Sequence, residues 1–175
     1  MRMRCVRWLG FLVLAALACG SSGGGPFTPT TPIADVCSML ALADVQALLP
    51  GAPAGAPLTL AGAPLTLDDT ADIWTRGCAW QANGMAVTLI VEGPLTSSGN
   101  LVLGFAVDAT SNGTTQATAV SGVGDKAAYL NNPGLDQILN ARKGSDVVSL
   151  AASVFTAEVP EASLQPLVVE ALGQL

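Results

Sequence analysis

Histidine is absent from the 175 residues of this chain. It is the usual general base near neutral pH, the commonest metal ligand, and the partner of serine or cysteine in nucleophilic catalysis. Its absence excludes those three arrangements, so any catalysis would have to rely on carboxylates, lysine or tyrosine. The sequence also lacks the Gly-x-Ser-x-Gly and Ser-x-x-Lys motifs that activate a serine.

Charged and aromatic side chains are scarce as well, at 11% and 5% of the chain. Only seven side chains are basic, and three of these, Arg2, Arg4 and Arg7, lie at the extreme N-terminus. Without that segment, four basic side chains remain against 13 acidic ones, a net charge of −9. Such a surface repels phosphates, so we expect no nucleic-acid partner.

The chain has no apolar run long enough to span a bilayer. Its most apolar run, residues 8–18, follows the three arginines and would form a helix of roughly 16 Å, about half of a ~30 Å hydrocarbon core. A basic start followed by a short apolar run is typical of an export signal. We therefore predict a signal peptide over residues 1–18 and no membrane-spanning helix.

The run ends in Ala16-Leu17-Ala18-Cys19, which resembles the lipobox of bacterial prolipoproteins. The resemblance implies that the Cys19 thiol receives a diacylglyceryl group carrying fatty-acyl chains such as palmitate, and that Cys19 becomes the mature N-terminus. Ala16 stands where the common lipobox has leucine. The alternative is an ordinary signal peptide, cut after an Ala-x-Ala-like site, with Cys19 unmodified.

A Gly/Ser-rich stretch over residues 20–25 and a Pro/Thr-rich stretch over residues 26–32 follow Cys19. These compositions form flexible and extended linkers, so we assign residues 19–34 to a tether. About 140 residues remain, enough for one domain, over 35–175. Two or more acyl chains would attach this domain stably to the membrane.

The resemblance to lipoproteins also implies a location. Gly20, rather than aspartate, follows Cys19. In a Gram-negative host this implies the outer membrane, with the domain facing the periplasm. In a Gram-positive or actinobacterial host we expect the outer face of the cytoplasmic membrane.

The four cysteines divide by position. Cys5 leaves with the leader and Cys19 takes lipid, so Cys37 and Cys78 remain as a pair in an oxidising compartment, where we expect a disulfide. The alternative is a redox-active pair. The two cysteines lack the Cys-x-x-Cys spacing of a redox-active pair, and Arg76 is the only basic residue near them in sequence.

A β-hairpin is the clearest local signal. Two strand-like runs, 74–82 and 85–92, flank Asn83-Gly84, whose residues readily adopt the positive φ of a two-residue turn. This turn pairs Cys78 with Leu89 and Trp80 with Val87, on the face expected to meet the core.

Helical spacing predicts an N-terminal helix over 38–49, a further helix over 94–110, and a C-terminal helix that begins at Pro160. Between the first two, a tandem repeat covers residues 55–61 and 62–68, and one Leu-Thr-Leu copy is expected to form an edge strand. Further strands are predicted over 114–120, 126–130, 135–141 and 146–155. The predicted fold is α+β, with an antiparallel sheet of about six to seven strands, the N- and C-terminal helices packed on it, and one internal disulfide.

Several short motifs, in this order, resemble a known group of proteins: Val36-Cys37-Ser38-Met39-Leu40, Gly77-Cys78-Ala79-Trp80, residues 122–128 (GVGDKAA) and Lys143-Gly144. The chain resembles the small actinobacterial lipoproteins of unknown function that carry Cys-x-Leu-Leu, Cys-aromatic and Gly-x-Gly-Asp motifs. The resemblance covers residues 35–175. It implies an α+β domain similar to the photosystem accessory protein fold, and no known catalysis.

Two short segments resemble ligand sites in composition. Asp68, Asp69 and Asp72 could bind Ca²⁺, but the EF-hand pattern is absent, so we predict a solvated loop and no metal or cofactor. Residues 122–126 (GVGDK) resemble part of a phosphate-binding loop, but an apolar strand follows where a helix would be required. We predict a strand-to-strand turn there.

We therefore expect a membrane-anchored envelope lipoprotein whose domain is not an enzyme. The domain would bind an envelope protein or small ligand, or play an accessory structural role, with Trp74 and Arg76 as candidate partner contacts. The alternative is a carboxylate-based envelope enzyme such as a glycan hydrolase. That enzyme would need two carboxylates at a defined separation in a cleft.

Overall fold

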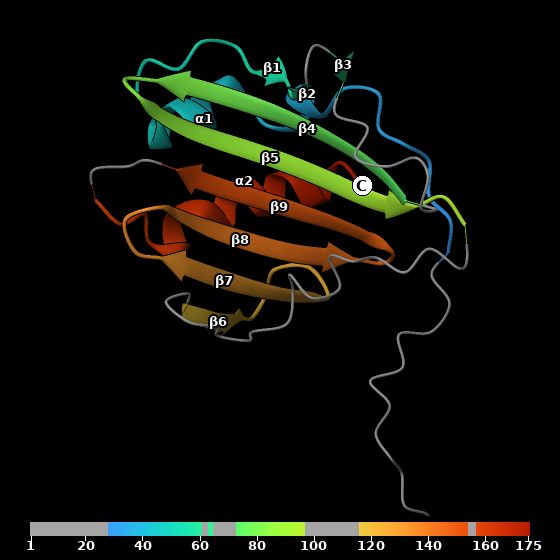
Figure 1. The fold of residues 1–175 in the computed structure, drawn as a ribbon. Coiled ribbons are helices and arrows are strands. Elements are labelled where there is room, and N and C mark those ends of the chain that lie inside the picture. The colour runs from blue at the N-terminus through green and yellow to red at the C-terminus, as the bar shows by residue number, and fades with distance from the viewer. Residues whose placement is uncertain (1–27, 61–62, 65–72, 97–115, 154–156) are drawn as a thin grey trace, which may run out of the picture.

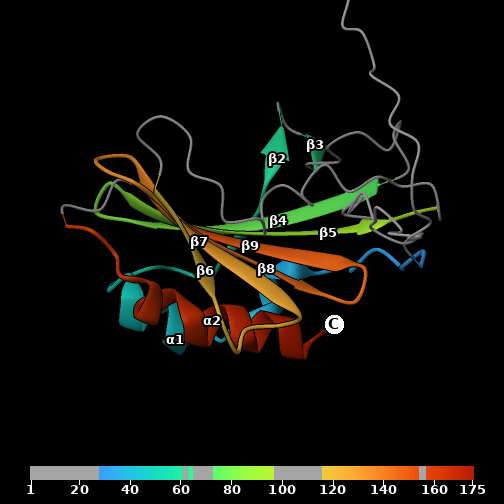
Figure 2. The ribbon, with the colours of Figure 1, turned by 90° about the horizontal axis from the view of Figure 1, so that it is seen from below.

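The protein is an antiparallel sheet covered on one face by helices, in a computed structural model that describes residues 28–60, 63–64, 73–96, 116–153 and 157–175 (Figure 1). Turning the molecule shows α1 and α2 beneath the sheet (Figure 2). The seven-stranded sheet and the two packed helices confirm the predicted α+β class.

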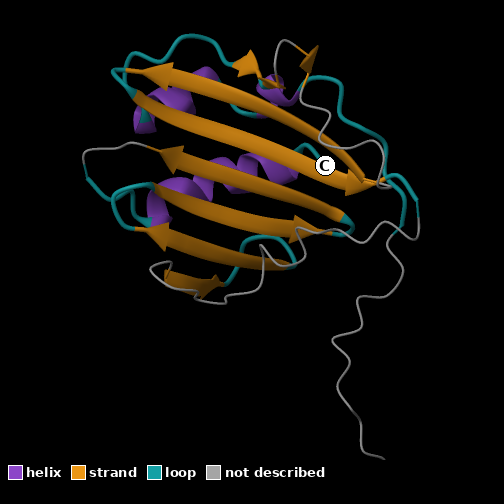
Figure 3. Ribbon diagram, viewed as in Figure 1, coloured by secondary structure: helices purple, strands orange, loops and turns teal. Residues whose placement is uncertain are grey.

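The helical segments are η1 (Val36–Met39), α1 (Leu42–Leu48) and α2 (Glu161–Gly173), coloured purple in Figure 3. The strands are β1 (Ala56–Pro57), β2 (Thr59–Leu60), β3 (Ala63–Pro64), β4 (Ile73–Ala82), β5 (Met85–Pro94), β6 (Gln116–Val120), β7 (Lys126–Asn132), β8 (Asp136–Lys143) and β9 (Asp146–Ser153).

The large sheet has the strand order β1-β4-β5-β9-β8-β7-β6. It therefore joins a hairpin, β4–β5, to a meander, β6 to β9, through the pairing of β5 with β9. Every pairing is antiparallel. The last strand of the chain thus lies at the centre of the sheet, beside the hairpin.

The β4–β5 hairpin has the predicted register, with Cys78 opposite Leu89. Asn83 and Gly84 form the turn with φ values of 54° and 78°. Their positive φ matches the right-handed twist of the two strands. Trp80 points into the core, as the alternation predicts, and is almost completely buried.

The disulfide between Cys37 and Cys78 is formed, with an S–S distance of 2.02 Å. It joins η1 to β4 across a sequence separation of 41 residues. The side chain of Asp35 accepts a hydrogen bond from the Cys37 amide and caps η1. The disulfide thus fastens the first helical segment to the hairpin.

The prediction of one continuous helix over 38–49 is wrong, because the segment forms two separate helices. Leu40 is extended, with φ −122° and ψ 130°, and separates η1 from α1. This break allows Met39 and Leu40 to be buried together with Val45 of α1. Burial of neighbouring apolar side chains outweighs the helical continuity that spacing alone favours.

The first Leu-Thr-Leu copy, residues 58–60, does not supply the predicted edge strand of the large sheet, and the second copy, residues 65–67, lies outside the described residues. The edge strand of the large sheet is β1, the Ala-Pro of the first copy, and it pairs with β4 at Ala79 and Cys78. Farther along the first copy, Thr59 pairs with Pro64 of the second copy, and these residues belong to the two-stranded β2–β3 sheet. Pro57 and Pro64 cannot donate a backbone hydrogen bond to these pairings.

Helix α2 covers the β8 and β9 part of the sheet with an apolar stripe. The stripe is buried as predicted and comprises Leu164, Leu167, Val168, Ala171 and Leu172. Pro166 lies in the early part of the helix. At the other end, the Lys143 ammonium donates to the Leu172 carbonyl at 2.8 Å, which satisfies one terminal carbonyl.

Some predictions fall outside the described residues: the leader with Cys19, the Asp68, Asp69 and Asp72 cluster, and the predicted 94–110 helix from residue 97 onward. Within the described ranges, no helix has both the length and the hydropathy to cross a bilayer.

Candidate functional site

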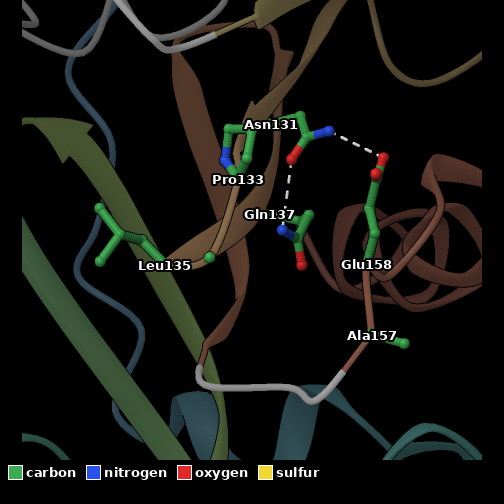
Figure 4. Close-up of a pocket in the computed structure, with 7 residues that line it drawn as sticks. Asn131, Pro133, Leu135, Gln137, Ala157 and Glu158 are labelled. Carbon is green, nitrogen blue, oxygen red and sulfur yellow. Dashed lines mark hydrogen bonds between the residues drawn. The ribbon is translucent and has the colours of Figure 1, made fainter.

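A small recess lies at the end of the sheet where β7 turns into β8 (Figure 4). Its volume is about 160 Å³. We call it the polar recess; its lining residues are Asn131, Pro133, Gly134, Leu135, Gln137, Ala157 and Glu158. It thus combines a strand end, a turn and the segment that leads into α2.

Two buried amides and a carboxylate form a chain of hydrogen bonds inside the polar recess (Figure 4). Gln137 Nε2 donates to Asn131 Oδ1 at 3.3 Å, and Asn131 Nδ2 donates to Glu158 Oε1 at 2.7 Å. Gln137 Oε1 also accepts from the Val159 amide at 3.2 Å. The amides therefore hold the 157–159 segment against the sheet, because a buried amide left unpaired would be costly.

Tyr129 reinforces this attachment from the core side. Its hydroxyl donates to the Val159 carbonyl at 2.7 Å. Burial raises the pKa of Tyr129, and the nearby charges of Glu158 and Glu161 raise it further. The phenol therefore stays protonated and continues to donate.

The polar recess offers one carboxylate, an exposed apolar side chain and two fixed amides. Leu135, at its mouth, is 71% exposed. This arrangement suits contact with a small polar group or a partner's side chain. Glu158 is the single acidic residue in the lining, whereas glycoside hydrolysis needs a pair of carboxylates across the scissile bond.

The turn at residues 122–126 joins two strands, as predicted, and not a strand to a helix. Asp125 accepts a hydrogen bond from the Gly144 amide at 2.7 Å, and the Asp125 amide donates to the Arg142 carbonyl at 2.7 Å. The aspartate thus ties this turn to the β8–β9 turn.

The two candidate partner contacts differ in exposure, and a contact at Arg76 stays a prediction. Trp74 is only 1% exposed, and its indole donates to Thr30 Oγ1 at 3.0 Å, so the expectation of a partly exposed ring is wrong. Arg76 is half-buried and donates to the Thr75 carbonyl. Thr30, in the chain before η1, thus lies against the Trp74 indole.

That N-terminal segment is attached to the sheet from Thr28 onward, ahead of the predicted domain start at residue 35. The Thr28 amide donates to Ser145 Oγ at 3.0 Å, and the Thr30 amide donates to the Pro94 carbonyl at 2.8 Å. A Pro/Thr-rich composition gives no signal of this attachment, because its partners lie more than 40 residues away in sequence.

Glu92 is a buried carboxylate on the sheet face opposite the helices. Burial raises its pKa to about 7, and a hydrogen bond with Thr75 opposes this rise. Within the described residues, no group of three or more metal-ligating side chains occurs.

Sequence reasoning missed Asn131, Gln137 and Glu158, which belong to separate segments. One signal was available: Gln137 shares a strand face with Leu139 and Ala141 and interrupts an apolar pattern. A polar residue at a core-facing position predicts a buried hydrogen-bond network.

Comparison with protein-family models, curated proteins and solved structures found no match to this chain.

Proposed function

We propose that this protein is an exported lipoprotein, anchored through Cys19, whose domain is a non-catalytic binding or accessory module of the cell envelope. The observation that carries the proposal is the disulfide between Cys37 and Cys78. A structural disulfide is expected in exported proteins and rare in the cytosol of mesophiles. It agrees with the basic, apolar leader over residues 1–18.

The placement of the polar recess supports a binding role. The N-terminal segment attaches where β5 ends and β9 begins, at Pro94 and Ser145. The recess lies where β9 ends and the β7–β8 turn begins. An anchored domain would thus present the recess at the end remote from its tether, accessible to an envelope partner.

Cell fractionation tests the anchor. In the proposed account, Cys19→Ser moves the protein from the membrane to the soluble fraction, because the acyl chains supply the attachment. Cys5→Ser is the matched control, since Cys5 lies in the leader, and it should leave the protein membrane-bound. Membrane association of Cys19→Ser would contradict lipid anchoring.

Site-specific photo-cross-linking tests the binding role in intact cells. A photoreactive residue at Leu135, at the mouth of the polar recess, should yield a defined adduct. The same residue at Val169, exposed on α2, is the control position. Equal labelling at both positions, or none at Leu135, would contradict the recess as the contact site.

A further inference from the structure

The N-terminal strap, defined as residues 28–33, is held at one end of the sheet by four hydrogen bonds to described residues. Thr30 contributes three: its amide donates to the Pro94 carbonyl, its hydroxyl donates to Asp146 Oδ1 at 2.6 Å, and that hydroxyl accepts from the Trp74 indole. Thr28 contributes the fourth through its amide, which donates to Ser145.

The strap packs closely against the end of β5. Gly93 lies beneath it on β5, and a Cβ there would collide with the Asp146 carboxylate, the Thr30 hydroxyl and the Trp74 indole. Only glycine leaves room for these three groups to meet. Farther along the strap, Ile33 packs against the hydrophobic core. Polar contacts and apolar packing therefore hold both ends of the strap.

Figures 1 and 2 both show the strap, in blue, beside the end of β5 and the β8–β9 turn. The β7–β8 turn and the polar recess lie at the opposite end of the strands. Strand β9 covers eight residues, so the two ends are separated by roughly 25 Å.

The charged side chains are distributed unevenly between these ends. All four basic residues that follow the leader lie toward the strap end: Arg76, Lys126, Arg142 and Lys143. Acidic residues also lie toward that end: Glu92 and Asp146, whose pKa burial raises, Asp125 beside Lys126, and Glu170 near the end of α2 that Lys143 contacts. Asp136, Glu158 and Glu161 lie toward the recess end.

We propose that the N-terminal strap fixes the orientation of the domain on the membrane, so that the strap end faces the lipid headgroups and the polar recess faces away. This inference rests on the proposed anchor at Cys19. Thr28 follows Cys19 by nine residues, which span at most roughly 30 Å. With the strap docked, the strap end stays within that distance of the bilayer. In an acidic chain, the end that holds every basic residue is repelled least by anionic headgroups.

Lipid-quenching measurements test the orientation on the lipidated protein in vesicles of phosphatidylglycerol and phosphatidylethanolamine. A fluorophore is placed by Ser121→Cys, in the β6–β7 loop at the strap end, or by Leu135→Cys, at the recess. With nitroxide-labelled headgroups, quenching should be several-fold stronger at position 121 than at 135. Equal quenching at the two positions would overturn the fixed orientation.

Releasing the strap should abolish the difference. Thr30→Val combined with Ser145→Ala removes the two hydroxyls that hold it, and the quenching ratio should fall toward one. Thr31→Val, an exposed neighbour, is the matched control and should keep the original ratio. An unchanged ratio in the double variant would show that the strap does not set the orientation.

Hydrogen exchange separates failure of this inference from failure of the anchor. In both the lipidated protein and the soluble Cys19→Ser variant, the Thr30 amide should exchange at least about tenfold more slowly than an unstructured amide. Rapid exchange in both would overturn the strap while leaving the anchor intact. Slow exchange in a Cys19→Ser protein that still binds membranes would overturn the anchor, and with it the orientation.

Discussion

Two glycines in the loop between β6 and β7 differ in what surrounds them. Gly122 and Gly124 both have positive φ, 78° and 60°. A Cβ on Gly122 would meet open space, whereas one on Gly124 would collide with the Arg142 carbonyl. Gly124 therefore serves two purposes, a left-handed turn and close contact with β8.

Alanine substitution at these positions should separate the two effects. Gly122→Ala should destabilise the domain by about 1–2 kcal/mol, the cost of a left-handed alanine. Gly124→Ala should cost clearly more, because the Arg142 carbonyl cannot move without disturbing the ladder. Urea denaturation of both variants measures the difference. Equal midpoints would contradict the close contact.

Glu92 makes the stability of the domain depend on pH. Its pKa of about 7 in the folded protein lies above the ordinary value of 4.5, so the native state binds the proton more tightly. Stability should therefore fall as pH rises from 4.5 to 7, by up to about 3 kcal/mol, and then level off. Asp146, whose pKa burial also raises, acts in the same direction at lower pH.

Glu92→Gln should remove most of this pH dependence, because glutamine stays neutral throughout. Denaturant unfolding at several pH values measures the slope. Thr88→Val, which changes an uncharged side chain of β5, is the comparison and should keep the wild-type slope. A variant at position 92 that retained the full slope would show that another group titrates.

The elements differ in how far their own sequence determines them. The β4–β5 hairpin was predictable in register because Asn83-Gly84 specifies the turn and period-two alternation specifies the faces. The α2 stripe was predictable for the same local reason. The break at Leu40 was not, since it depends on what η1 packs against after the disulfide forms.

The disulfide should contribute most of the stability that attaches η1 to the sheet. The Cys37→Ala/Cys78→Ala variant should lose roughly 4 kcal/mol, given the 41-residue separation. Urea denaturation under non-reducing conditions measures this loss. A change below about 1 kcal/mol would show that packing of η1 and α1 alone holds the N-terminal segment.

For the molecule as a whole, the α+β class and the disulfide followed from composition and local patterns, but the functional surfaces did not. The polar recess assembles Asn131, Gln137 and Glu158 from three segments, and the strap joins Thr30 to Asp146 across most of the chain. Such contacts depend on the order of strands in the sheet. The burial of Trp74 was not predictable for the same reason, since its indole bonds to Thr30 of the strap.

The central proposal is an exported, lipid-anchored domain with an internal disulfide. Intact-mass measurement of the protein extracted from its host membrane tests this directly. We predict a chain that begins at Cys19, carries a diacylglyceryl group, and gains two hydrogens only after reduction of the Cys37–Cys78 bond. A chain that retains residues 1–18, or one that begins at Cys19 without lipid, would contradict it.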